Sequence, residues 1–229
     1  PVSDEARQGL LGQGSILALT SHAERTSPVL RGKWVLENLL GLQVPPPPPD
    51  VPPLKDREDG QKPRTMREQM TEHRANPVCA ACHKTLDPIA GLFQDYWKFA
   101  DQGVYGRRKG GWFADMFGPG YEGEDMPASE RWRALQWLGE RTAKDPRFAV
   151  AMTEHAYYLL TGRKILLAPK DLDDPLFAAK RRAYAEQRKQ VESIATRFAA
   201  NGFNFKEVIK DWVASDFYRA DGVATAAAD

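Results

Sequence analysis

The feature that most constrains this chain is the pentapeptide Cys79-Ala80-Ala81-Cys82-His83. Cys-x-x-Cys-His is the attachment signature of c-type haem. Two thiols three residues apart on a helical turn reach the two vinyl groups of one porphyrin edge. The adjoining histidine then presents its imidazole to the iron. The motif therefore predicts one covalent haem c, attached at Cys79 and Cys82 and ligated by His83.

Three other interpretations of the cysteine pair have less support. A thioredoxin-like dithiol favours a preceding aromatic residue in a βαβ context, whereas Pro77-Val78 precedes this pair. A structural zinc site needs a second pair of Cys or His ligands at matching spacing. The chain has no further cysteine, and His22, His73 and His155 lie far apart in the sequence. A disulfide across two intervening residues would be strained and would contribute little stability.

Composition limits the remaining classes of function. The 229 residues suffice for one sizeable core or two small ones. The 32 Lys and Arg residues are balanced by 31 Asp and Glu, which argues against a dedicated nucleic-acid binder. No apolar run approaches the length of a membrane span, so we expect no transmembrane helix.

The amino-terminal sequence resembles the interior of a domain. The chain begins with Pro1, and neither an initiator Met nor the basic and apolar regions of a signal peptide follow. We therefore expect a mature or trimmed chain, the carboxy-terminal part of a longer protein. Its expected partners are other chains or an amino-terminal portion of that protein.

Apolar periodicity predicts six or so helices and almost no strand, so the expected fold class is mainly α. More finely, we expect a cytochrome c-like helical haem domain with an additional carboxy-terminal helical region. The first expected helix runs from Ser27-Pro28 to Gly41, the second spans 65–75, and the third begins at Ser129. The fourth runs from Pro146 to about Gly162, the fifth from Asp173-Asp174-Pro175 to about Asn201, and the sixth from Lys206 to Phe217.

These elements predict four regions. Residues 1–44 form a helical segment that packs on the haem domain, and 45–64 form a Pro-rich extended linker. Residues 65–145 form the haem c domain, with a glycine-rich loop or short hairpin at 103–123, and 146–229 form the carboxy-terminal helical region. Five consecutive prolines, Pro45–Pro49, favour polyproline II, either as a stiff spacer or as a ligand for a groove-type domain.

Several segments resemble the planctomycete-type cytochrome c-associated family. They are 25–40 (Arg-Thr-Ser-Pro-Val-Leu-Arg-Gly-Lys-Trp-Val-Leu-Glu-Asn-Leu-Leu), the proline run, 73–83 with the haem motif, and Leu86-Asp87-Pro88-Ile89. The resemblance covers most of residues 7–100, and 148–163 and 203–219 look like the family's carboxy-terminal domain. Members are large, exported proteins with domains of unknown function around a haem c motif. The resemblance implies an exported, haem-bearing carboxy-terminal portion of a larger protein and no known reaction.

The chain departs from the family pattern after Asp87-Pro88. Members usually continue with an acidic, aromatic stretch that ends in Gly-x-x-Arg. Here Gln94-Asp95-Tyr96-Trp97-Lys98 and an aromatic, glycine-rich insert take its place. We expect this insert to reshape the exposed edge of the haem.

The second axial ligand decides the function of such a haem. Met126 is the first candidate, because Glu124-Asp125-Met126-Pro127 resembles the Met-Pro loop of small soluble cytochromes c. His155, His22 and, with less support, Met116 are the other candidates. A Met or His ligand gives an electron carrier, and an open face gives ligand binding or oxidative chemistry.

Haem propionates need cationic partners, and guanidinium groups pair with carboxylates through two hydrogen bonds. The candidates are Arg25, Arg31 and Arg163, and the family resemblance favours Arg31.

We therefore expect an exported c-type cytochrome, periplasmic or extracellular, with one haem that transfers single electrons to a redox partner protein. A haem enzyme with an open distal site, peroxidase- or oxygenase-like, is one alternative. A haem-bearing structural subunit of a larger complex is the other.

Overall fold

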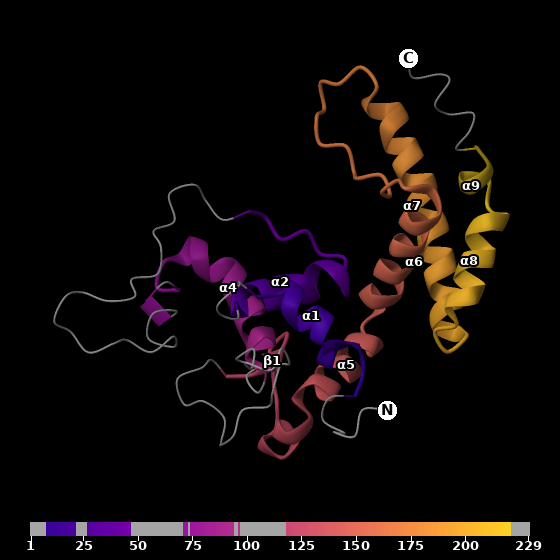
Figure 1. The fold of residues 1–229 in the computed structure, drawn as a ribbon. Coiled ribbons are helices and arrows are strands. Elements are labelled where there is room, and N and C mark those ends of the chain that lie inside the picture. Colours follow the sequence, from indigo (N-terminus) through magenta and orange to yellow (C-terminus); the bar gives the residue numbers. More distant parts are fainter. Residues whose placement is uncertain are drawn as a thin grey trace. The chain divides into compact units, whose positions relative to one another are not determined.

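The computed structural model describes residues 8–21, 27–46, 71–72, 74–93, 96 and 118–220. Within them the protein is mainly helical, as the sequence predicts (Figure 1). The chain divides into two compact units. Unit 1 comprises Pro1–Asn38 and Leu42–Lys144, and unit 2 comprises Leu39–Gly41 and Asp145–Asp229.

Unit 1 holds the cysteine motif. Its elements are η2 (Leu10–Gly12), α1 (Gly14–Leu19), α2 (Pro28–Asn38), α4 (Pro77–Gly91), β1 (Gly120–Tyr121), β2 (Glu124–Asp125), η4 (Ala128–Arg133) and α5 (Ala134–Lys144). The elements of unit 2 are α6 (Pro146–Thr161), α7 (Phe177–Ala200), α8 (Phe205–Ala214) and α9 (Asp216–Ala220).

Polar residues followed by proline begin two of the helices in unit 1. The hydroxyl of Ser27 accepts a hydrogen bond from the backbone N–H of Leu30 at 3.2 Å, so the predicted start of α2 is confirmed. The side chain of Asn76 accepts one from Val78 N–H at 3.0 Å and begins α4. Asn76-Pro77 is therefore a helix start immediately before the cysteine motif.

Close packing of α2 against α4 fixes the helix that carries the motif. A Cβ atom at Gly32 would lie 2.5 Å from the backbone oxygen of Leu86, so only glycine permits this approach. Val35 on α2 and Ile89 on α4 are fully buried. The two helices therefore meet through their backbones as well as their side chains.

A short hairpin precedes α5. β1 pairs with β2 in antiparallel register, Gly120 opposite Asp125 and Tyr121 opposite Glu124. Glu122 and Gly123 form the turn with φ of 48° and 90°, the conformation that two-residue hairpins prefer. The sequence predicts a loop or short hairpin over 103–123. The hairpin lies at its end, and 103–117 lie outside the described residues.

In unit 2, helices α6, α7 and α8 each pack against the other two (Figure 1). The indole N–H of the fully buried Trp212 donates to the backbone oxygen of Thr153 at 2.9 Å. Its ring centroid lies 4.8 Å from that of Tyr157. The shared core consists of Ala149, Ala156, Tyr157, Val191, Ile194, Ala195, Phe198, Val208 and Trp212.

Three predicted helices differ in detail. The helix predicted from 206 to 217 is divided at Ser215, whose hydroxyl donates to Trp212 O at 2.7 Å and separates α8 from α9. The helix predicted from 175 begins at Phe177, because Asp174 accepts a hydrogen bond from Leu176 N–H at 2.8 Å. The segment after Ser129 begins as the 3-10 helix η4. Residues 47–70, with most of the proline run and of the predicted helix at 65–75, lie outside the described residues.

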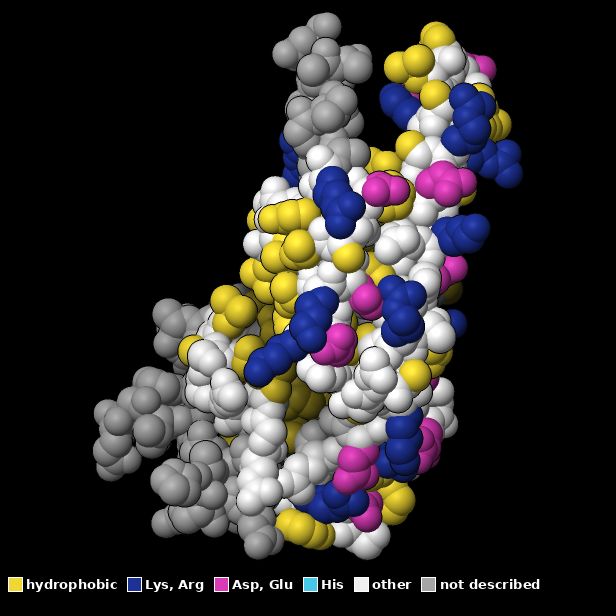
Figure 2. Space-filling model, turned by 90° about the vertical axis from the view of Figure 1, so that its right-hand side faces the viewer, with side chains coloured by type: hydrophobic (Ala, Val, Ile, Leu, Met, Phe, Trp, Pro, Cys, Tyr) yellow, Lys and Arg dark blue, Asp and Glu magenta, His cyan; other side chains and the backbone are white. Residues whose placement is uncertain are grey.

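In the described part of the chain, no helix combines the length and the hydropathy that a membrane crossing requires. On the face drawn in Figure 2, Lys and Arg side chains lie among acidic and hydrophobic ones, as expected for a nearly balanced charge.

Candidate functional site

The cysteine motif lies in the first half of α4, which is more exposed than the second half. Cys79 and Cys82 are free thiols, both half-buried, and lie one helical turn apart. Val78 beside them is 64% exposed, whereas Ile89 near the end of α4 is fully buried. Two accessible thiols beside an uncovered apolar side chain fit a flat apolar group attached along this face.

His83 is held by a buried carboxylate on the same helix. Its Nδ1 lies 2.9 Å from Oδ1 of Asp87, one turn later. An ionised carboxylate only accepts hydrogen bonds, so its position favours the neutral tautomer of His83 with the proton on Nδ1 and the lone pair on Nε2. The His83 side chain is 13% exposed and that of Asp87 is fully buried. This arrangement leaves Nε2 with the lone pair that a metal ligand requires.

Arg74 is the second charged neighbour of Asp87. Its Nε lies 3.5 Å from Oδ2 of Asp87, and its side chain is 29% exposed. Sequence reasoning missed both Asp87 and Arg74 as site residues. The spacing of four between His83 and Asp87 was the available signal, because residues four apart share one face of a helix.

Arg31, the favoured partner of a haem propionate, lies on α2 and contacts the chain just after α4. It is 3% exposed. Its Nη1 donates to the backbone oxygen of Tyr96 at 2.7 Å and to that of Phe93 at 3.4 Å. The guanidinium carbon also lies 5.6 Å from the centroid of the Phe93 ring. These contacts join α2 to the chain after α4, and a role for Arg31 toward a propionate stays a prediction.

Met126 follows β2 and is buried, with 8% of its surface exposed. Its backbone N–H donates to Pro119 O at 3.0 Å, which closes the hairpin. β1 of the same hairpin packs against α4. The structure therefore places this candidate ligand on a hairpin that contacts the helix of His83.

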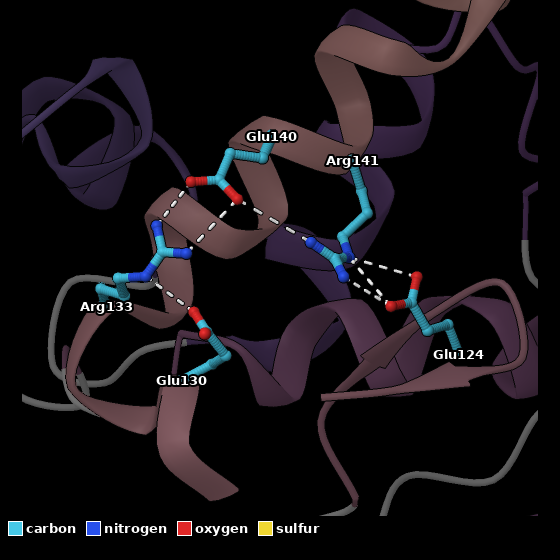
Figure 3. A network of polar contacts seen from close by, with 5 residues as sticks. All are labelled: Glu124, Glu130, Arg133, Glu140 and Arg141. Carbon is cyan, nitrogen blue, oxygen red and sulfur yellow. Dashed lines mark hydrogen bonds and ion pairs between the residues drawn. The ribbon is translucent and has the colours of Figure 1, made fainter. Parts of the chain in front are cut away.

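An ion-pair network fixes this hairpin to α5 (Figure 3). Nε of Arg141 on α5 donates to both carboxylate oxygens of Glu124 on β2, at 3.2 and 3.1 Å. These hydrogen bonds hold the pKa of Glu124 below its ordinary value. The guanidinium carbon of Arg141 also lies 3.9 Å from the centroid of the buried Trp137 ring. Met126 is two residues beyond Glu124, so this anchor also restrains Met126.

The same network joins η4 to α5. Arg133 pairs with Glu130 at 2.7 Å and with Glu140 at 2.5 Å (Figure 3). The hydrogen bond raises the pKa of Arg133 and lowers that of Glu140, because each group stabilises the charge of the other. All these groups are exposed enough for solvent to screen them, so the network orients the segment more than it stabilises the fold.

The remaining candidates do not join His83 in unit 1 among the described residues. His155 lies on α6 and Arg163 follows that helix, so both belong to unit 2. His22, Arg25 and Met116 lie outside the described residues. Within the described ranges, no group of three or more His, Cys, Asp or Glu side chains is arranged to hold a metal ion.

Comparison with known proteins gives one family match. Residues 7–102 match the model of PSCyt3, described as a protein of unknown function (DUF1588). The match includes α2 and α4 and supports the resemblance to planctomycete cytochrome-associated proteins. No curated protein and no solved structure matches the chain. The cytochrome c-like fold of the haem domain therefore stays a prediction.

Proposed function

We propose that the protein is an exported c-type cytochrome that carries one haem on Cys79 and Cys82 and transfers single electrons. The observation that carries this proposal is the arrangement on α4. Two free, half-buried thiols lie one turn apart, and the neighbouring His83 has its Nδ1 occupied by Asp87. This combination suits thioether attachment along one face, with Nε2 as the axial ligand.

A bound haem supplies one-electron iron chemistry. The side chains of this chain do the rest. Cys79 and Cys82 would hold the group without a deep pocket, His83 would ligate it, and the anchored hairpin would offer Met126 as the candidate second ligand. The exported location is part of the proposal and rests on what the family resemblance implies. A single-electron role implies a redox partner protein. The exposed first half of α4 is the surface that we expect this partner to contact.

Haem staining of a denaturing gel tests the attachment. The chain is exported in a host with c-type haem maturation and stained after denaturation, so only covalent haem is detected. We expect a stained band for the wild type and none for Cys79→Ala/Cys82→Ala. Lys84→Ala is the matched control, because Lys84 is exposed on the same helix and should leave the stain intact. An unstained wild-type band would contradict the proposal.

The carboxylate on His83 also supports a second candidate function. A carboxylate that accepts from Nδ1–H makes the imidazole a stronger donor, which favours oxidised iron and suits oxidative chemistry at an open distal face. Carbon monoxide binding to the reduced protein separates the candidates. Rapid binding would favour the haem enzyme, and no binding would favour the electron carrier with both axial positions filled.

A further inference from the structure

Asp87 is a buried carboxylate with few partners. Its side chain is fully buried. Oδ1 accepts from Nδ1 of His83 at 2.9 Å, whereas Oδ2 has no hydrogen-bond donor among the described residues. Nε of Arg74 lies 3.5 Å from Oδ2. The negative charge of Asp87 is therefore directed at His83 and, more weakly, at Arg74.

A purely structural role does not account for this arrangement. A pair four residues apart on a helix stabilises it by only about 0.2–0.5 kcal/mol. The removal of a carboxylate from water costs several kcal/mol unless its hydrogen bonds are replaced, and Oδ2 finds no donor in the described part of the chain. A buried polar group with an incomplete set of hydrogen bonds calls for an explanation, and a redox or catalytic role is one that structures supply.

The effect of the carboxylate on the imidazole follows from charge. When the carboxylate of Asp87 accepts a hydrogen bond from Nδ1–H of His83, it fixes the tautomer and orientation of the imidazole ring. It also raises the electron density at Nε2. A more electron-rich ligand stabilises oxidised iron relative to reduced iron. We infer that Asp87 is a positioning residue that orients His83 and lowers the reduction potential of the bound haem, an inference that rests on the proposed function.

Arg74 acts in the opposite direction. Its guanidinium draws the charge of Asp87 toward Oδ2 and away from His83, so it limits the lowering of the potential. Removal of Asp87 and removal of Arg74 should therefore shift the potential in opposite directions. A loosened site would not produce paired shifts of opposite sign.

Redox titration of the haem-loaded protein tests the inference. In Asp87→Asn the ratio of reduced to oxidised haem at a fixed ambient potential should rise about tenfold. For a one-electron couple this corresponds to a reduction potential about 59 mV higher than that of the wild type. In Arg74→Gln the ratio should fall a few-fold. Glu154→Gln is the control, because it removes a carboxylate that pairs with Arg188 in unit 2, and it should leave the ratio within twofold. Unchanged ratios in Asp87→Asn and Arg74→Gln, or shifts of the same sign, would overturn the inference.

Two readouts keep the inference separate from the proposed function. If Asp87→Asn does not fold, Arg74→Gln, at a partly exposed side chain, still tests the predicted direction of the shift in reduction potential. Nitrogen NMR of haem-free Cys79→Ala/Cys82→Ala in mildly alkaline buffer reports the tautomer of neutral His83. We expect the proton on Nδ1, and a shift of the tautomer toward Nε2 when Asp87→Ala is added, because alanine offers Nδ1–H no acceptor. If haem attaches normally and Nε2 already carries the proton, the inference fails alone. If no haem attaches, the proposed function fails and the claim about the potential fails with it.

Discussion

Replacement of Gly32 by alanine should destabilise unit 1 through the contact between α2 and α4. The new Cβ would lie 2.5 Å from the backbone oxygen of Leu86, whereas ordinary contacts begin at 3.4 Å. The two helix backbones must therefore separate by about 0.9 Å, the difference of those distances, because a backbone atom cannot rotate away. Such overpacking typically costs about 1–3 kcal/mol.

The intrinsic preference for alanine in helices acts against this cost. Alanine is favoured over glycine by about 0.8–1.0 kcal/mol in a helix interior. Gly139→Ala is the matched control, because Gly139 lies inside α5 and a Cβ there would meet nothing within 4 Å. The helix preference cancels between the two variants, so Gly32→Ala should be less stable than Gly139→Ala by about 1–3 kcal/mol.

Urea unfolding followed by circular dichroism measures the difference. Gly139→Ala should raise the free energy of unfolding and Gly32→Ala should lower it relative to the wild type. Since Leu86 precedes Asp87, a displaced α4 should also reduce haem loading of Gly32→Ala. Equal stabilisation by both substitutions would refute the close approach of α2 and α4.

Three further predictions concern the core, the pH dependence and the distal ligand. Trp212→Phe should lower the free energy of unfolding of unit 2 by about 1–2 kcal/mol, measured by chemical denaturation, because it removes the hydrogen bond to Thr153 O. Burial raises the pKa of Glu154 above 4.5 despite its ion pair with Arg188, so folded unit 2 binds this proton more readily than the unfolded chain. Thermal stability should therefore rise as the pH falls through the raised pKa toward 4.5, and Glu154→Gln should flatten that dependence. If Met126 is the distal ligand, Met126→Ala should abolish the long-wavelength ferric band of Met-ligated haem, and an unchanged optical spectrum would remove it from consideration.

Local signals in the sequence predicted α2 and the helices of the carboxy-terminal region but not the bounds of α1 or α4. Proline after a capping residue marks the starts of α2 and α6. The proline ring fits the first helical turn, and the side chain of the capping residue accepts a hydrogen bond from a backbone N–H that has no partner within the helix. The same signal at Asn76-Pro77 identifies the start of α4, although the sequence analysis placed only a helix end near it. The break at Ser215 was not predictable, because it depends on a side-chain hydrogen bond to Trp212 O in an otherwise periodic segment.

The site was predictable only in part. Spacing singles out Cys79, Cys82 and His83 as candidates, because haem c attachment uses those residue types in that order, and their role stays a prediction. The partners of Arg31 depend on tertiary contacts more than 60 residues away, which no local pattern encodes. The burial of Asp87 likewise depends on the tertiary fold. Sequence spacing suggests that Asp87 and His83 share a helix face, but only the fold shows a buried carboxylate on the imidazole.

The central claim is that one haem is joined to this chain through two thioether bonds, and intact-mass measurement tests it most directly. The chain is exported in a host that matures c-type cytochromes, then denatured, reduced and weighed. The account predicts a gain of one haem mass, and peptide mapping should place it on the segment that contains Cys79 and Cys82. A chain with the unmodified mass and two alkylatable thiols would contradict the account.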